Sequence, residues 1–194
     1  VLSRTYQLAS EFDPSQLGED EQYDERLFAR AIVRRLTAEQ LLDAQSAVLA
    51  VPARFEGYPY GTRAVEIAGV ERVRRKLNDG DVFLRQFGKP ERLLSCECER
   101  SDDPTLGQAL SLVGGESLNA RLSHPDNRIG KLLSTSSDHR TAIESLFWTA
   151  LSRAPTAQES EASIDLITQT GDPRGTLEDL MWALLNAKEL IFRN

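Results

Sequence analysis

The chain has 194 residues, 40% of them hydrophobic, and carries 30 acidic against 23 basic residues for a formal net charge of -7. This length suffices for one domain with its own hydrophobic core, and we expect a single mostly helical domain over residues 1–194. The negative charge argues against a nucleic-acid or anionic-membrane surface, and no window approaches eighteen uninterrupted apolar residues, so no membrane insertion is expected.

The N-terminal half contains one clear helix start followed by a long connecting segment. Thr37, with Gln40 three residues later, matches a capping box, in which each side chain bonds an amide that the helix leaves unpaired. Apolar residues repeat at helical spacing from there to Leu49. Residues 52–64 combine glycine, proline and tyrosine, which is typical of a loop.

A second helix is expected to start at Asp103, because Pro104 suits the first helical position, where the amide has no partner within the helix. The glycine pair at 114–115 should kink or break it, since each glycine inside a helix costs about 1 kcal/mol relative to alanine. Leu118 and Leu122 then continue the apolar pattern beyond the break.

The C-terminal half predicts further helices with distinct start and stop signals. One begins at Asp138 and ends before Pro155. The next starts at a capping box formed by Thr156 and Glu159 and closes at Gly171, a residue that readily ends a helix.

After a turn at 172–175, Thr176 is expected to cap the last helix. One side of that helix would carry Leu177, Leu180, Met181, Leu184, Leu185 and Phe192. Short connections favour an antiparallel up-down packing of the three C-terminal helices. Trp148 and Trp182 are expected in the core or at its edge. The fold class is therefore all-α, an irregular multi-helix bundle with long loops in the N-terminal half.

Cys96 and Cys98 are the two cysteines of the chain and lie one residue apart. A structural zinc site needs four ligands, usually two close pairs, and the histidines, His124 and His139, are not paired with each other. A disulfide across one residue is sterically demanding. Metal binding and a strained, reversible disulfide remain alternatives, and we favour two small, buried structural thiols with no metal.

Two groups of residues are candidates for a functional site. Glu97 and Glu99 beside Arg100 offer carboxylates for acid–base chemistry, although the same pattern is typical of a structural ion-pair cluster. Tyr58, Tyr60 and Arg63 in the loop offer aromatic faces and a guanidinium, which suit stacking on sugar rings or holding an anionic group. Arg100 is a further binding candidate. A tyrosine-anchored structural loop is the alternative for the second group.

Eight short segments occur in an order that resembles a known family. They are Ser3–Gln7, Arg34–Glu39, Gly61–Ala64, Phe87–Pro90, Cys96–Arg100, Pro104–Leu106, Leu151–Arg153 and Trp182–Asn186. Together they resemble the planctomycete PSD1-type domain, an uncharacterised C-terminal module of large exported proteins, and the likeness covers nearly the whole chain.

The resemblance implies a setting and no particular activity. Members typically follow a second uncharacterised domain, and many also carry a cytochrome c domain, sometimes with carbohydrate-binding modules. It implies that the chain is the C-terminal part of a longer exported protein, periplasmic or secreted. Covalent haem attachment needs two cysteines separated by two residues and followed by histidine, which this chain lacks. We therefore expect no cofactor in this chain and any c-type haem in an upstream domain.

Two functions follow as hypotheses. The first is a non-catalytic module that docks against neighbouring domains of the same chain. The second is an enzyme or substrate-binding domain acting on extracellular polysaccharide, with Tyr58, Tyr60 and Arg63 contacting sugar and Glu97 or Glu99 as acid or base. Polysaccharide is the external partner in the second hypothesis.

Overall fold

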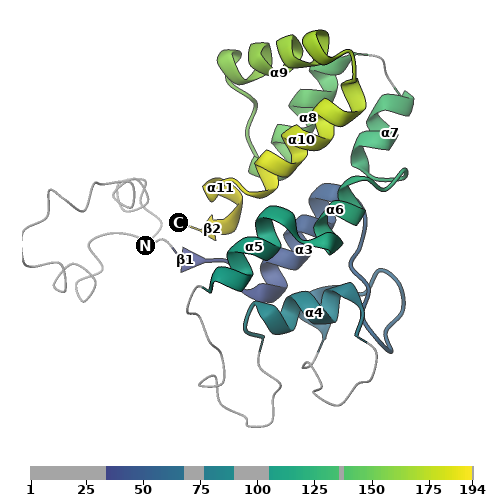
Figure 1. Cartoon of the computed structure of the whole chain (residues 1–194), viewed down its shortest axis with the longest axis vertical. Coiled ribbons are helices and arrows are strands. Elements are labelled where there is room, and N and C mark those ends of the chain that lie inside the picture. Colours follow the sequence, from purple (N-terminus) through teal and green to yellow (C-terminus); the bar gives the residue numbers. More distant parts are fainter. Residues whose placement is uncertain (1–33, 68–76, 90–104, 136–137, 194) are drawn as a thin grey trace, which may run out of the picture. The chain divides into compact units, whose positions relative to one another are not determined.

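The structure is a computed structural model that describes residues 34–67, 77–89, 105–135 and 138–193. Within these ranges the chain is mostly α-helical, which confirms the expected all-α class (Figure 1). The chain divides into two units, residues 1–36 with 192–194 and residues 37–191. The described part of the first unit is a short antiparallel pair of strands, β1 (Arg34–Arg35) and β2 (Phe192–Arg193).

The second unit begins with α3 (Ala38–Leu49), which starts where the sequence predicts. Thr37 Oγ1 accepts the Gln40 N–H at 3.3 Å and Gln40 Oε1 accepts the Thr37 N–H at 3.1 Å, so the capping box is confirmed. The segment after it is a loop with one 3-10 turn, η3 (Ala64–Glu66). Both α4 (Asp79–Gln86) and η3 pack against α3.

The next helix, α5 (Leu106–Gly114), begins later than predicted. Its N-cap is Thr105, whose hydroxyl accepts the Gln108 N–H at 3.2 Å, while Gln108 Oε1 accepts the Thr105 N–H at 3.3 Å. The predicted start at Asp103 is therefore wrong, because this threonine and glutamine form a complete capping box two residues further on.

The break at the glycine pair is confirmed. Gly115 has an extended backbone and ends α5 while it begins α6 (Glu116–Leu122). Leu118 and Leu122 of α6 are both buried, as their spacing predicts. The following helix, α7 (Arg128–Thr135), packs against α3, α8 and α10.

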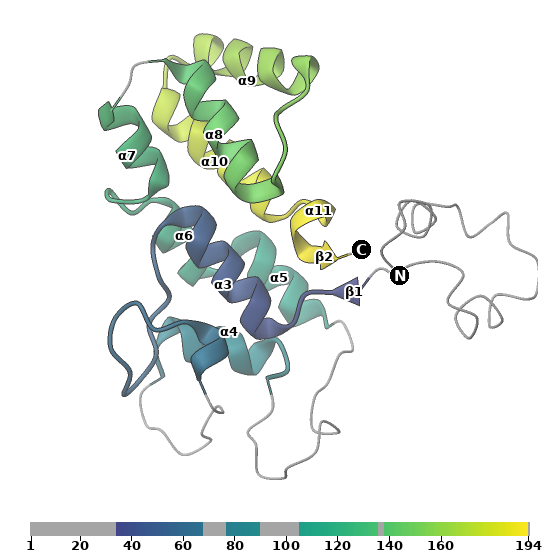
Figure 2. The same cartoon turned by 180° about the vertical axis from the view of Figure 1, so that it is seen from behind.

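Three helices of the C-terminal half, α8 (His139–Leu151), α9 (Ala157–Thr170) and α10 (Pro173–Leu185), each contact the other two. In Figures 1 and 2, α8 and α10 lie side by side and run the same way, while the segment after α8 leads back and α9 lies across their upper ends, so the predicted antiparallel up-down packing is correct only in part. The short helix α11 (Lys188–Ile191) follows and contacts α8 and α10.

The starts of α8 and α9 are confirmed, and the start of α10 is corrected. Asp138 caps α8, and Thr156 with Glu159 forms the capping box of α9. At α10 the cap is Asp172, whose Oδ1 accepts the Gly175 N–H at 3.0 Å. Pro173 suits the first turn of a helix, and Asp172 directly before it is a good N-cap. The helix therefore begins at Pro173, and Thr176 lies inside it.

Two aromatic predictions in this half are also wrong. Trp148 is exposed on α8, whereas Trp182 lies at the core edge, where its Nε1 donates to Val113 O at 2.8 Å. Phe192 lies in β2, because α10 ends at Leu185 and α11 stops before it.

The core of the second unit is formed by aliphatic side chains of α3, α4, α7, α8 and α10. The largest fully buried apolar side chains are Leu41, Leu42, Leu49, Leu84, Ile129, Ile143, Leu146, Leu177, Met181 and Leu185. Because α3 contributes three of these leucines and contacts both α7 and α8, it joins the N-terminal helices to the C-terminal ones.

Candidate functional site

The loop at 52–64 is anchored on the start of α4. The Arg54 N–H donates to Asp79 Oδ1 at 3.0 Å, and the Glu56 N–H donates to Asp81 Oδ2 at 2.8 Å. These bonds fix the loop backbone at two points, so its aromatic side chains are presented from a defined support.

Tyr58 and Tyr60 line a shallow cleft of about 290 Å³ together with Arg54 and Asn78. Tyr60 is 64% exposed, and the Arg54 guanidinium carbon lies 5.3 Å from the centre of its ring. An exposed ring beside a guanidinium suits stacking against a flat polar group such as a sugar. Sugar binding by these tyrosines stays a prediction.

Arg63 lies in a different recess, of about 500 Å³, which Asp43 also lines. Its Nε is 3.6 Å from Asp43 Oδ2, and the same carboxylate accepts the N–H of Ala64 at 2.6 Å and of Val65 at 3.3 Å. The structure therefore brings the two tyrosines together and places Arg63 apart from them, beside a carboxylate.

The other site residues named from the sequence, Cys96, Glu97, Cys98, Glu99 and Arg100, lie outside the described residues. In the part of the chain that the structure does describe, no group of three or more His, Cys, Asp or Glu side chains could hold a metal ion. No helix in those same ranges is long and apolar enough to cross a membrane.

A larger cleft, of about 750 Å³, lies among α4, α5 and α6, and the sequence patterns described above do not predict it. Its apolar lining consists of Leu77, Val82, Phe83, Leu110 and Leu118. Arg121 also lines it, although this side chain lies three residues from Leu118 on the buried face of α6. A charged residue at a position where helical spacing predicts an apolar one is the signal that would have pointed here.

The Arg121 side chain is held by neutral groups. Arg121 is 5% exposed and donates to Ser46 Oγ at 3.3 Å, Gln45 Oε1 at 3.3 Å and Ser117 O at 3.4 Å. Burial lowers the pKa of Arg121, and the charge of Asp79 opposes this to a smaller extent. An arginine that is nearly buried and bonded to neutral acceptors is suited to receive an anion.

A second buried cation, Lys89, has a structural position. Its Nζ donates to Ala64 O at 3.0 Å and Ile67 O at 2.5 Å, and lies 3.6 Å from Glu39 Oε1. Since Lys89 is 5% exposed and holds the end of η3 against α3 and α4, it stabilises the loop and offers no surface to a ligand.

Comparison with known families identifies the chain. A family model described as PSD1, a protein of unknown function (DUF1553), matches residues 1–167. The chain belongs to this family. No curated protein matches it, and neither does any solved structure. The PSD1 match covers the tyrosine cleft, the Arg121 cleft and most of α9.

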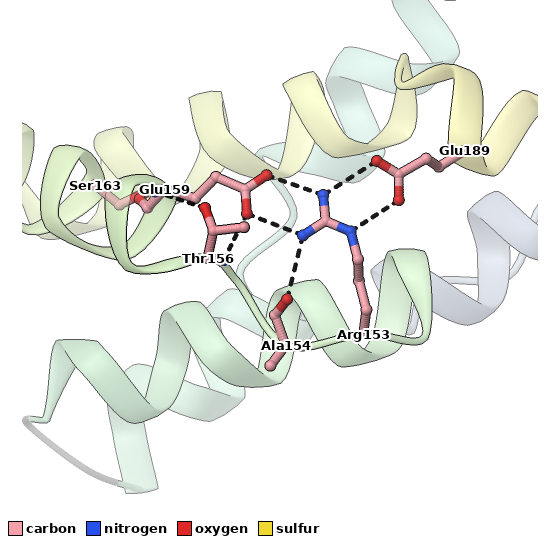
Figure 3. A network of polar contacts seen from close by, with 6 residues as sticks. All are labelled: Arg153, Ala154, Thr156, Glu159, Ser163 and Glu189. Atoms are coloured by element: carbon pink, nitrogen blue, oxygen red, sulfur yellow. Dashed lines mark hydrogen bonds and ion pairs between the residues drawn. The ribbon is translucent and has the colours of Figure 1, made fainter. Parts of the chain in front are cut away.

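In this PSD1 domain, Arg153 is at the centre of a polar network that joins α8, α9 and α11 (Figure 3). Its Nε and Nη2 donate to Glu189 at 2.8 and 3.1 Å, and its Nη1 and Nη2 donate to Glu159 at 2.9 Å each. Nη1 also donates to Ala154 O at 3.2 Å, so all five N–H groups are used.

These hydrogen bonds favour the ionised carboxylates. The bond from Arg153, and then the Thr156 N–H, lower the pKa of Glu159 to about 2, and Arg153 also lowers the pKa of Glu189. Because every donor of Arg153 has a partner within the domain, this network is a structural clamp and carries no ligand chemistry.

Proposed function

We propose that this PSD1 domain is a non-catalytic module that docks against a neighbouring domain of the same exported protein. The observation that carries the proposal is the apolar stripe of α5, formed by Leu106, Leu110 and Val113, which are 76%, 63% and 56% exposed. Spacings of four and three residues place the three side chains on one face of the helix.

The orientation of α5 is the reverse of an ordinary surface helix. Its buried residue is Gln108, whose Nε2 donates to Gln86 O at 3.0 Å, while Gln86 Nε2 donates to Gly107 O at 2.6 Å. Polar groups thus attach α5 to α4, and the apolar stripe is left outward. An outward apolar stripe on a helix fixed in this way is typical of an interaction surface.

The partner that fits this surface has an apolar centre and a basic rim, since the chain carries a net charge of -7. A domain tethered to the same chain would be held at high effective concentration and would not have to be captured from solution. In this proposal the parent is extracytoplasmic, any c-type haem belongs to an upstream domain, and the PSD1 domain itself needs no cofactor.

The docking proposal is tested with this chain and the remainder of its parent protein produced as separate polypeptides. Calorimetry should detect binding between them, and Leu106→Asp or Val113→Asp should weaken it about tenfold or more, because a carboxylate would have to be desolvated. Leu166→Asp, on an exposed leucine of α9, is the matched control and should bind as the wild type does. Absence of binding, or equal loss in the control, would refute docking through α5.

Polysaccharide recognition is a second candidate, supported by the exposed ring of Tyr60 beside Arg54. A glycan array of the isolated chain should then give binding that Tyr60→Ala abolishes, since stacking needs the ring. If the chain also turned over a polysaccharide and Glu99→Ala removed that turnover, the module would be an enzyme and the docking proposal would be wrong in its non-catalytic part.

A further inference from the structure

The Arg121 guanidinium has capacity to bind an anion. A guanidinium carries five N–H donors, and the described residues accept three hydrogen bonds from it, at 3.3, 3.3 and 3.4 Å, which is long for N–H···O. No ion pair joins Arg121 to a carboxylate within the described ranges. Neutral partners offset only part of the free-energy cost of removing a cation from water. A hydrogen-bonded carboxylate would offset more of it.

The two acids that line the same cleft do not supply that carboxylate. Asp79 accepts the Arg54 N–H at 3.0 Å on one oxygen and the Ser117 hydroxyl at 3.0 Å on the other. Glu116 is exposed at the start of α6. Asp79 acts on Arg121 through its charge, but none of the three hydrogen bonds that Arg121 donates to the described residues goes to Asp79, so the guanidinium keeps donors for a group from outside.

The rest of the cleft favours an apolar body attached to that anion. Its volume of about 750 Å³ suits a small organic ligand. Phe83 and Leu118 are buried in the lining, and Val82 and Leu110 are exposed in it. A simple inorganic anion would leave this apolar surface uncovered, whereas an aliphatic or aromatic chain would remove it from water.

We infer that the cleft among α4, α5 and α6 binds a small organic carboxylate with an apolar body, whose carboxylate is anchored on Arg121. This inference goes beyond the docking function and does not rest on it. Leu106 and Val113, the residues that test docking, are not among the residues that line the cleft.

Three probes separate the charge from the apolar body. Octanoate carries both, 1-octanol has the same chain length without the charge, and acetate has the charge without the chain. Calorimetry on the whole chain should show octanoate binding about tenfold or more tightly than either of the others, as expected for a charge-assisted hydrogen bond in a partly dry site. In ¹⁵N NMR spectra, octanoate and not octanol should shift the Arg121 Nε–H signal.

Variants then assign the preference to this arginine. Arg121→Met should bind octanoate and octanol equally, Arg121→Lys should keep part of the preference, and Arg140→Met, the same change on exposed Arg140 of α8, should keep all of it. If Arg121→Met does not fold, the wild-type NMR shift decides. Equal affinity for octanoate and octanol, an unmoved Arg121 signal or an unchanged preference in Arg121→Met would overturn the inference. Leu106→Asp should leave octanoate binding unchanged, so failure of docking and failure of this site are distinguishable.

Discussion

Arg121 and Arg153 show how differently the two halves of the helical unit use charge. The five N–H groups of Arg153 donate to two carboxylates and one backbone carbonyl, and its side chain is 34% exposed. Arg121 is 5% exposed and donates three hydrogen bonds, all to neutral acceptors. The exposed arginine is satisfied by its own domain, whereas the buried one keeps donors beside a cleft. This difference is the reason for proposing a ligand site among α4, α5 and α6 and a role in cohesion for α8 to α11.

The surrounding residues follow the same division. In α8 and α10 large aliphatic side chains are buried, whereas Trp148 of α8 and Leu166 of α9 are exposed, and the clamp around Arg153 lies near the surface. In α4 and α6, Asp81 and Arg121 are buried, as is Lys89 shortly after α4, while the α5 stripe is exposed. An arrangement that buries charges and exposes leucines lowers stability unless a partner or ligand covers it, which is why both proposals concern this half.

The largest expected effect tests whether the C-terminal half is the cohesive one. Leu177→Ala removes a fully buried side chain of α10 and should lower the free energy of unfolding by about 2–5 kcal/mol, because it leaves a cavity. Urea unfolding of the wild type and the variant measures this change in the free energy of unfolding. Leu166→Ala on exposed Leu166 of α9 is the matched control and should change stability by about 0.5 kcal/mol or less. Equal effects of the two variants would break the comparison.

The next effect tests whether a buried charge of the N-terminal half is structural. Lys89→Met removes the donor to Ala64 O and Ile67 O and should cost about 2 kcal/mol, since buried carbonyls lose a charged partner. Hydrogen exchange should show faster opening of η3 at the same time. Lys131→Met, on an exposed lysine of α7, should leave both measurements unchanged. If Lys89→Met left the free energy of unfolding unchanged, Lys89 would not be what holds η3 against α3 and α4.

A smaller effect separates the two glycines of the break. A Cβ on Gly115 would collide with the backbone oxygen of Ser111, so Gly115→Ala should cost about 1–2 kcal/mol. A Cβ on Gly114 meets nothing within 4 Å, so Gly114→Ala should be neutral or stabilise by about 0.5 kcal/mol. Thermal unfolding of the pair measures the difference. If both variants were neutral, the α5–α6 junction that shapes the Arg121 cleft would not depend on close backbone contact.

Local chemistry explains which features of the fold the sequence predicts. The capping boxes that start at Thr37 and Thr156 each span four consecutive residues, and both are confirmed. The start of α10 was misplaced because Asp172 and Thr176 are both good caps, and the proline after Asp172 decides between them. The start signal at Asp103 and Pro104 likewise predicts a helix for the α5 region without showing which of its faces is buried.

The candidate sites depend on contacts far apart in the chain, and the sequence shows them poorly. Arg121 is buried because α3 supplies Ser46 and Gln45, which lie 75 and 76 residues earlier. Lys89 is buried by carbonyls 25 and 22 residues away. Tyr58, Tyr60 and Arg63 share one loop and are predicted as one binding group, but the backbone between them turns so that Arg63 meets Asp43 on α3.

The smallest expected effect concerns the clamp around Arg153 and its dependence on pH. The folded pKa of Glu159, about 2, lies below its ordinary value of 4.5, so the clamp contributes fully above about pH 4.5 and its contribution is lost as pH falls towards 2. Since Arg153 and Glu159 are each 34% exposed, solvent screening reduces this contribution to about 1 kcal/mol.

Urea unfolding of the wild type and Arg153→Met between pH 7 and pH 2 tests this directly. The stability difference between them should shrink to nearly nothing at pH 2, whereas Arg85→Met, on an exposed arginine of α4, should show a small difference at every pH. A difference that persists at pH 2 would mean that Arg153 stabilises the C-terminal helices mainly through the Phe147 ring, whose centre lies 5.3 Å from the guanidinium carbon. The contrast with Arg121 would then rest on burial alone and not on the pairing of charge.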